Sequence, residues 1–153
     1  MIMMSACLAG INCKYNGKNN LHPAFKALAE NGDVLLVCPE ELGGLPVPRS
    51  SSEICKGTGE DVLAGRATVI NREGNDITRH FIMGAQTAFE LGKNQGIDLA
   101  ILRRRSPSCG CGKIYDGTFT STMRNGDGVF AALLKRNAIN VVSDEEYLEK
   151  EYK

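Results

Sequence analysis

The sequence lacks an excess of charge of either sign. Its 153 residues include 18 lysines and arginines and 18 aspartates and glutamates. A chain with this balance has no overall electrostatic field to draw it to nucleic acid or to an anionic membrane. We therefore expect a protein that binds neither.

Long apolar segments are also missing. The sequence contains no run of about 18 apolar residues, the length that spans a bilayer. Residues 1–6 are too short for a secretory signal and lack its basic flank. A cytoplasmic protein with a single domain over residues 1–153 is therefore expected.

Paired CxxC motifs are absent, although the chain has six cysteines. In a reducing compartment such thiols are better candidates for metal ligands, redox groups or buried apolar side chains than for disulfides. Zinc sites usually contain CxxC pairs, and electron-transfer iron-sulfur clusters usually take four cysteines, often in a compact run. The sequence shows neither pattern, so the positions of the cysteines must decide their role.

The pattern of apolar residues predicts a single-domain α/β fold. Near-continuous apolar runs, typical of strands buried on both faces, occupy residues 2–6, 33–37, 98–102 and 139–142, and a short edge strand is expected at 67–71. Helical spacing occupies residues 23–31, 76–96 with Asp76 as the cap, 129–135 and 145–150. The segment 39–52, rich in Gly, Pro and Ser, is predicted to be an irregular loop. This alternation indicates a Rossmann-like open, mostly parallel sheet with helices on both faces, and a mixed sheet with one antiparallel edge is the alternative.

Three cysteines lie at predicted strand ends. Cys7 and Cys38 directly follow strands, and Cys109 lies in the SPSCG loop after the strand at 98–102. Because ligands of open parallel sheets bind outside the carboxyl ends of the strands, we expect these side chains to share one crevice. Thiolates select soft metals and iron-sulfur clusters, and three ligands would leave one iron of a cluster open to a substrate atom. The alternative is three small buried side chains of apolar character.

Several motifs in order resemble one microbial family. The segments SACLAGINCKYNG, VCPEELGGLPVPR and RRSPSCG, followed by IYDGTF and GDGVFAALL, are similar to the TudS-like thiouracil desulfurase family over nearly the whole chain. This resemblance implies a 4Fe-4S cluster held by Cys7, Cys38 and Cys109, with one iron open to the substrate sulfur. It further implies removal of sulfur, without redox change, from 4-thiouracil or its nucleoside or nucleotide.

A reaction of this kind needs a group that accepts a proton from water. Glu40, the glutamate of the family's CPE motif, is the first candidate for this base and Glu41 the second; a solvated loop carboxylate is the alternative for either. Burial is expected to raise the pKa of the base. Ser106 and Ser108 either orient the water or the substrate, or serve as turn residues.

Further residues of the loop after Cys38 are candidates for substrate binding. Gly43 and Gly44 would let the backbone approach a ligand, or they form a tight turn. Arg49 offers a planar fork of donors to a uracil oxygen or a phosphate, or pairs with a carboxylate elsewhere.

The remaining candidates are weaker. Arg103, Arg104 and Arg105 either attract a phosphorylated substrate or form a solvated charge run, which we favour. Cys13 and Cys111 are possible substitute ligands or sulfur relays. A structural role is expected for Cys55, and neither a ligand nor a base role for His22 and His80.

Two rival functions remain open from the sequence. One is an enzyme without a cluster, in which Cys109 is a nucleophile or redox thiol. The other is a non-catalytic module that binds zinc or an iron-sulfur cluster. Expected partners are a thiolated pyrimidine and the iron-sulfur assembly machinery, and the chain is expected as a monomer or homodimer.

Overall fold

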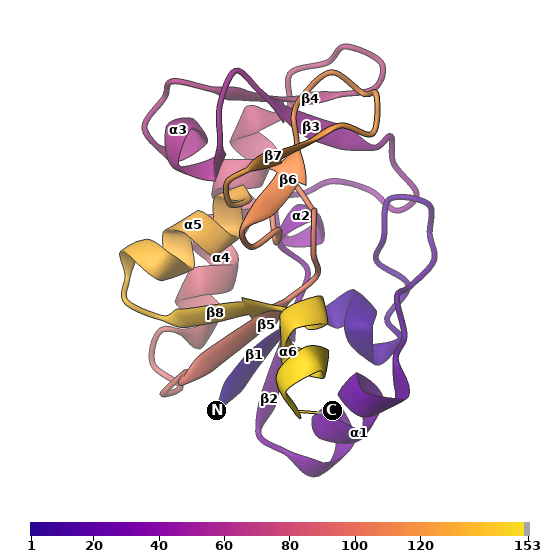
Figure 1. The fold of residues 1–153 in the computed structure, drawn as a ribbon, viewed down its shortest axis with the longest axis vertical. Coiled ribbons are helices and arrows are strands. Elements are labelled where there is room, and N and C mark those ends of the chain that lie inside the picture. The colour runs from indigo at the N-terminus through magenta and orange to yellow at the C-terminus, as the bar shows by residue number, and fades with distance from the viewer. Residues whose placement is uncertain (152–153) are drawn as a thin grey trace.

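A four-stranded sheet forms the centre of the molecule (Figure 1) in the computed structural model, which describes residues 1–151. The sheet contains β1 (Ile2–Ser5), β2 (Val34–Val37), β5 (Leu99–Leu102) and β8 (Asn140–Ser143), in the order β2-β1-β5-β8. All three pairings are parallel. The predicted α/β fold with a parallel sheet is therefore confirmed, and within residues 1–151 no antiparallel edge strand joins this sheet.

Helices cover both faces of this sheet. Met3 and Ala100 point to one face and belong to the core that includes Phe81 of α4 (Thr78–Gly92) and Phe130 of α5 (Val129–Arg136). Their neighbours in the strands, Met4 and Ile101, point to the other face, as expected from the two-residue period of a strand. That face is covered by α1 (Pro23–Asn31) and α6 (Asp144–Glu151). The sheet is thus buried on both sides, and each of its large side chains contributes about 1.5–3 kcal/mol.

The helix predicted over 76–96 is shorter than expected. It begins at Thr78, whose backbone N–H bonds to the Asp76 carboxylate at 2.9 Å, and ends at Gly92. Gly96 has φ +68, a left-handed backbone that an α-helix does not contain. The Asp76 carboxylate therefore binds the first N–H group of the helix, although Asp76 lies two residues before the helix begins.

Two other expectations are wrong. The strand at 67–71 forms as β4 (Thr68–Asn71), but it pairs antiparallel with β3 (Ser52–Cys55) and not with the central sheet. The segment 39–52 is not wholly irregular, because Pro39–Leu42 forms the short helix α2. A proline in the first turn and two glutamates beside it favour a helix start, a signal that the density of Gly and Pro obscured.

The remaining elements surround one end of the molecule. The β3–β4 pair and a second antiparallel pair, β6 (Lys113–Tyr115) with β7 (Met123–Asn125), lie together away from both chain termini (Figure 1). Helix α3 (Gly59–Leu63) lies beside them, and a 3-10 helix, η1 (Ala6–Ala9), follows β1. None of the described helices is long and apolar enough to cross a membrane.

Candidate thiol-lined active site

Four cysteine side chains line one cavity of about 410 Å³. Cys7 lies in η1 directly after β1, Cys38 directly after β2, and Cys109 in the loop after β5. The parallel topology therefore brings the three strand-end cysteines to one place, as the sequence analysis expected. The fourth, Cys13, comes from the loop after η1.

Serine hydroxyls form the turn that positions Cys109. The Ser106 hydroxyl accepts hydrogen bonds from the backbone N–H groups of Ser108 and Cys109, both at 3.1 Å. The Ser108 hydroxyl donates to the Cys109 sulfur at 3.7 Å. Both serines also line the cavity, so the turn role and a role toward a ligand are compatible.

The Cys13 thiol contacts the thiols of both Cys7 and Cys38. Hydrogen bonding with the Cys13 thiol, whose one hydrogen can point to either sulfur, lowers the pKa of Cys7 to about 7, against the effect of burial, and lowers the pKa of Cys38. The pKa of Cys13 is raised by these same hydrogen bonds, and burial raises the pKa of Cys109. The amide of Asn20 adds a further donor to the Cys7 sulfur at 3.4 Å. In the chain alone, Cys7 and Cys38 are therefore the thiols most readily ionised.

Glu40 lines the cavity and is paired with Arg49. A guanidinium nitrogen of Arg49 lies 2.7 Å from Oε2 of Glu40. The side chain of Glu40 is 18% exposed and that of Arg49 is 6% exposed. Arg49 also donates to the carbonyl oxygens of Cys13 at 2.8 Å and Pro46 at 3.2 Å. Burial opposes the charge of Arg49, but the Glu40 carboxylate outweighs it and leaves the pKa of Arg49 raised. Its donors are therefore used inside the protein, and the structure favours the alternative reading of Arg49 as a partner of a carboxylate.

Helix packing accounts for the position of Gly43. A Cβ atom on Gly43 would lie 2.0 Å from the carbonyl oxygen of His80, so the glycine permits α2 to cross α4 closely. Gly44, with φ +90, forms the turn after α2. Among the described residues, the lining of the cavity includes neither glycine, and Glu41 is exposed outside it.

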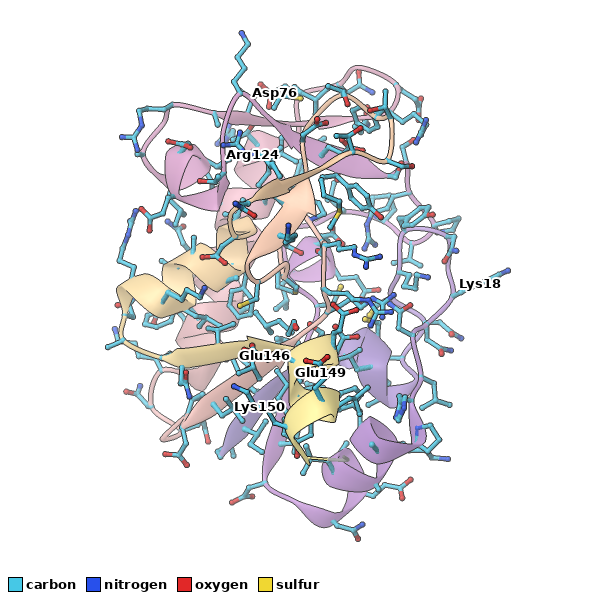
Figure 2. The ribbon with its side chains drawn as sticks, viewed as in Figure 1. Lys18, Asp76, Arg124, Glu146, Glu149 and Lys150 are labelled. Atoms are coloured by element: carbon cyan, nitrogen blue, oxygen red, sulfur yellow. The ribbon has the colours of Figure 1, made fainter. Side chains whose placement is uncertain are left out.

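Positive charge is concentrated on the cavity wall. The cationic residues that line it are Lys14, Arg72, Arg103, Arg104 and Arg105. By contrast, Lys18 points away from the body of the molecule (Figure 2). Asp144, buried at the start of α6, lies 3.0 Å from Arg103 and 3.3 Å from Arg104. The expectation of a solvated charge run is therefore wrong for these two arginines, which a buried carboxylate holds in place.

The other cysteines and the histidines lie outside the cavity lining. Cys55 and Cys111 donate to backbone oxygens of Gly117 at 3.6 Å and of Val141 at 3.7 Å. His22 accepts a hydrogen bond from the N–H of Ala24 at the start of α1, and His80 bonds to the carbonyl of Gly43. These contacts fit the structural roles expected for Cys55 and the histidines.

Several residues that line or support the cavity were not identified from the sequence, and three of them show why. Asp144 and Asn20 act through partners far along the chain, and only their spatial neighbours reveal them. Glu53 lies on β3, a strand that was not predicted, and also lines the cavity. The residues of SEIC do not alternate between polar and apolar, so they gave no strand signal.

The donor set suits an iron-sulfur cluster. Within residues 1–151, no group of three or more His, Cys, Asp or Glu side chains is arranged to hold a metal ion. Ligands of a polynuclear cluster bind separate irons, so their sulfur atoms surround a volume instead of meeting at one point. Thiols on several walls of one cavity, with Asn20 and Ser108 as donors to sulfur, are the kind of surroundings that such clusters have.

The fold and the site together define a small α/β protein with a thiol-lined ligand cavity at the carboxyl ends of its parallel strands. Residues 2–146 match the family model described as 2-thiouracil desulfurase. The chain therefore belongs to the 2-thiouracil desulfurase family, a family of enzymes.

Two relatives extend this comparison. The chain is 42% identical over 146 residues to the uncharacterized protein YbbK of Bacillus subtilis (strain 168), which covers 95% of this chain and 97% of that protein. Among solved structures it is similar to the 4Fe-4S-dependent thiouracil desulfidase TudS, with a TM-score of 0.83 and 39% identity. That match covers 97% of this chain and 93% of the other.

Proposed function

We propose that this chain removes sulfur from a thiolated pyrimidine, 4-thiouracil or its nucleoside or nucleotide, with a 4Fe-4S cluster held by Cys7, Cys38 and Cys109. The observation that carries the proposal is that these three cysteines, from three different strand ends, line one cavity together with Glu40. Membership of the 2-thiouracil desulfurase family and the likeness to a 4Fe-4S-dependent desulfidase support it.

Three cysteine ligands leave one iron of a 4Fe-4S cluster open to the substrate. When bound, the cluster supplies a Lewis-acidic iron that polarises the carbon–sulfur bond. Cys13 lies beside the sulfurs of Cys7 and Cys38, and we assign its single S–H as a donor to one of these two sulfurs and not as a ligand.

Glu40 is assigned as the proton acceptor. Pairing with Arg49 at 2.7 Å holds the carboxylate of Glu40 in place at the cavity wall, where a base must lie. Glu40 takes a proton from water as the water oxygen attacks the ring carbon, and Glu40 then returns this proton to the departing sulfur. Sulfur leaves as hydrosulfide when the new hydroxyl loses the second water proton to become the carbonyl, and that proton completes hydrogen sulfide. No oxidant or reductant is consumed. Glu41 is the weaker candidate because it lies outside the cavity.

The hydroxyl groups of Ser106 and Ser108 lie 3.0 Å apart on the cavity wall. Ser106 already accepts two backbone hydrogen bonds, so its own hydrogen is left to reach Ser108 or a molecule in the cavity. We assign Ser106 to orienting the attacking water and Ser108 to contact with the substrate, as second functions beside the turn.

The cationic wall favours an anionic substrate. Lys14 and Arg105, which have no ion-pair partner among the described residues, and the donors that Arg72, Arg103 and Arg104 have left match a phosphate group. Among the substrate forms, we therefore rank the nucleoside monophosphate first. Its kcat/KM should exceed that of the free base and should fall as the salt concentration rises.

Anaerobic reconstitution tests the proposal. The protein should turn brown, bind iron and acid-labile sulfide in near-equal amounts, and convert 4-thiouracil or its monophosphate to the oxygen product with release of sulfide. Cys7→Ser, Cys38→Ser and Cys109→Ser should each lose iron, whereas Cys55→Ser and Cys13→Ser should retain it. A colourless, zinc-loaded protein would support the metal-binding module instead.

Turnover by the protein without iron would support the rival enzyme in which Cys109 acts directly. If Glu40→Gln keeps full turnover, the assignment of the base is wrong. We further assign the protein to the cytoplasm and expect the iron-sulfur assembly machinery to load it, since exposed clusters and free thiols require reducing conditions.

A further inference from the structure

Glu53 is a buried carboxylate whose charge is not balanced by a neighbouring cation. It lies on β3 and is 8% exposed. None of the ion pairs within the described part of the chain includes it, whereas the buried Asp144 has two arginine partners. A charged group buried in this way costs several kcal/mol unless hydrogen bonds satisfy it.

Two backbone groups satisfy one oxygen of this carboxylate. The N–H groups of Gly117 and Phe119 donate to Oε1 at 2.9 and 3.1 Å. They belong to a loop in which Gly117, Phe119 and Ser121 all have positive φ. A Cβ on Gly117 would lie 2.6 Å from the carbonyl oxygen of Ile54, so this loop is pressed against β3. Oε1 of Glu53 therefore anchors a constrained loop.

The second oxygen, Oε2, faces the cavity. Both hydrogen bonds go to Oε1, and the described residues give Oε2 no partner. Oε2 is also not among the buried polar atoms that lack a partner, so it is open to solvent. Because Glu53 lines the thiol-lined cavity, that opening is the cavity itself.

The charges of the cavity wall indicate which substrate group Oε2 of Glu53 can bind. Most charged groups of the wall are cations that donate hydrogen bonds to the oxygen, sulfur or phosphate of a substrate. Glu40 and Glu53 are the carboxylates among the described lining residues, and Glu40 is already paired with Arg49. Oε1 of Glu40 also has no partner among the described residues, but it is the oxygen left for the attacking water. A ring that carries both acceptors and an N–H donor therefore meets Oε2 of Glu53.

We propose that Oε2 of Glu53 accepts a hydrogen bond from a ring N–H of the thiolated pyrimidine and selects rings that carry this donor. This inference rests on the proposed function. A ring with a bare nitrogen or a methyl group at that position would leave the carboxylate unsatisfied, which is a strong basis for rejection. Glu53 is thus a specificity-determining residue.

Glu53→Gln separates this role from the anchoring of the loop. Its side-chain carbonyl can still accept from Gly117 and Phe119, while an NH2 group replaces the acceptor that faces the cavity. For the reconstituted enzyme with 4-thiouracil, kcat/KM should fall about 10- to 100-fold, mainly through KM. Iron content should not change. Glu60→Gln, on an exposed glutamate of α3, is the matched control and should behave as the wild type.

Methylated substrates identify the contact. Because N1 carries the sugar in a nucleotide, the donor is the N3–H. Wild-type enzyme should therefore discriminate against 3-methyl-4-thiouracil by about 10- to 100-fold but accept 1-methyl-4-thiouracil, and Glu53→Gln should lose most of that discrimination. If Glu53→Gln retains wild-type KM and full discrimination while Glu53→Ala loses activity, Glu53 only anchors the loop and the proposal is wrong.

A binding experiment keeps this test separate from the proposed function. Calorimetry with uracil and the reconstituted protein should show weaker binding by Glu53→Gln than by the wild type. If the wild type turns over 4-thiouracil and Glu53→Gln binds uracil as tightly as the wild type, only the role of Glu53 is overturned. A wild type that neither binds uracil nor converts 4-thiouracil overturns the proposed function, and the role of Glu53 with it.

Discussion

At the scale of single residues, the chemistry of the site depends on which donors are already used. Arg49 illustrates this, since its fork of donors suggested substrate binding from sequence, yet Glu40, Cys13 and Pro46 occupy it. The same contacts hold the Glu40 carboxylate at the cavity and fix the backbone of Cys13 beside it. Arg49 is therefore a positioning residue.

Replacement of Arg49 tests this role. Arg49→Met should lower kcat about 10-fold or more with a smaller effect on KM, because Glu40 loses the group that orients it. It should also lower the free energy of unfolding by about 3 kcal/mol, since a mostly buried pair loses one partner. Steady-state kinetics, iron analysis and urea denaturation measure these effects.

A conservative variant and a surface ion pair provide the controls. Arg49→Lys should recover part of kcat through the remaining charge. Arg66→Met removes an exposed partner of Asp61 and should change stability by less than about 1 kcal/mol. If Arg49→Met raises KM and leaves kcat unchanged, Arg49 contacts the substrate after all.

The sequence identified most of these residues but not all of their roles. Cys7, Cys38 and Cys109 were expected at strand ends and Glu40 in the CPE motif after the second strand, and all four line one cavity. Roles set by contacts across the fold were not predictable, because Arg49 and Gly43 each find their partner in another element. Residue type shows what a side chain can bond to, and only the fold shows what lies beside it.

At the scale of elements, the crossing of α2 and α4 sets the position of the cavity wall. Gly84 of α4 faces α2, and a Cβ there would lie 1.8 Å from the carbonyl oxygen of Pro39. Gly43, directly after α2, makes the reciprocal contact, because a Cβ there would meet the carbonyl oxygen of His80 in α4. Because Cys38 and Glu40 flank Pro39, this glycine-mediated contact fixes both of them relative to the rest of the site.

Gly84→Ala should therefore disturb both stability and the site. The added methyl group meets backbone, which cannot move aside as a side chain can, so the free energy of unfolding should fall by about 3 kcal/mol. The displaced α2 should also reduce the amount of iron retained after reconstitution. Gln86→Ala, at an exposed position of the same helix, should leave both quantities unchanged. Equal stability of Gly84→Ala and the wild type would contradict the close crossing.

Elements with a strong period were predicted well, and short ones were not. The central strands and α1 agree with the sequence patterns to within a residue or two, because burial on both faces imposes continuous apolar runs. The strands of the pairs β3–β4 and β6–β7 have three or four residues each and mix polar with apolar residues, and of these only β4 was expected. These short elements carry the cavity wall that contains Glu53 and Tyr115, so the unpredicted part of the fold is the part that contacts a ligand.

At the scale of the whole molecule, the charges are distributed unevenly although the net charge is zero. Lys14, Arg72 and the arginines at 103–105 gather around one cavity, where the carboxylates of Glu40 and Glu53 are the described acidic groups. Composition alone could not reveal this, because the five cations come from segments that lie far apart in the sequence. Overall balance excludes a general attraction to polyanions and leaves room for a local one toward a small anion.

The cavity also connects the parts of the molecule. Its cysteines come from the segments after β1, β2 and β5, while Glu53 comes from β3, outside the central sheet. A group bound by Cys7, Cys38 and Cys109 would cross-link three chain segments that otherwise meet through strand pairing, hydrogen bonds and packing. Binding to the folded state alone stabilises that state by mass action.

Removal of the cluster should therefore lower the stability of the whole chain. A bound group that adds about 3 kcal/mol to the free energy of unfolding raises the Tm of a chain of this size by roughly 6–12 °C. Anaerobic thermal denaturation should show this difference between reconstituted and chelator-treated protein. The difference should persist in Cys55→Ser, whose thiol lies outside the cavity lining, and vanish in Cys109→Ser. An equal Tm with and without iron would mean that the three cysteines do not hold the cluster jointly.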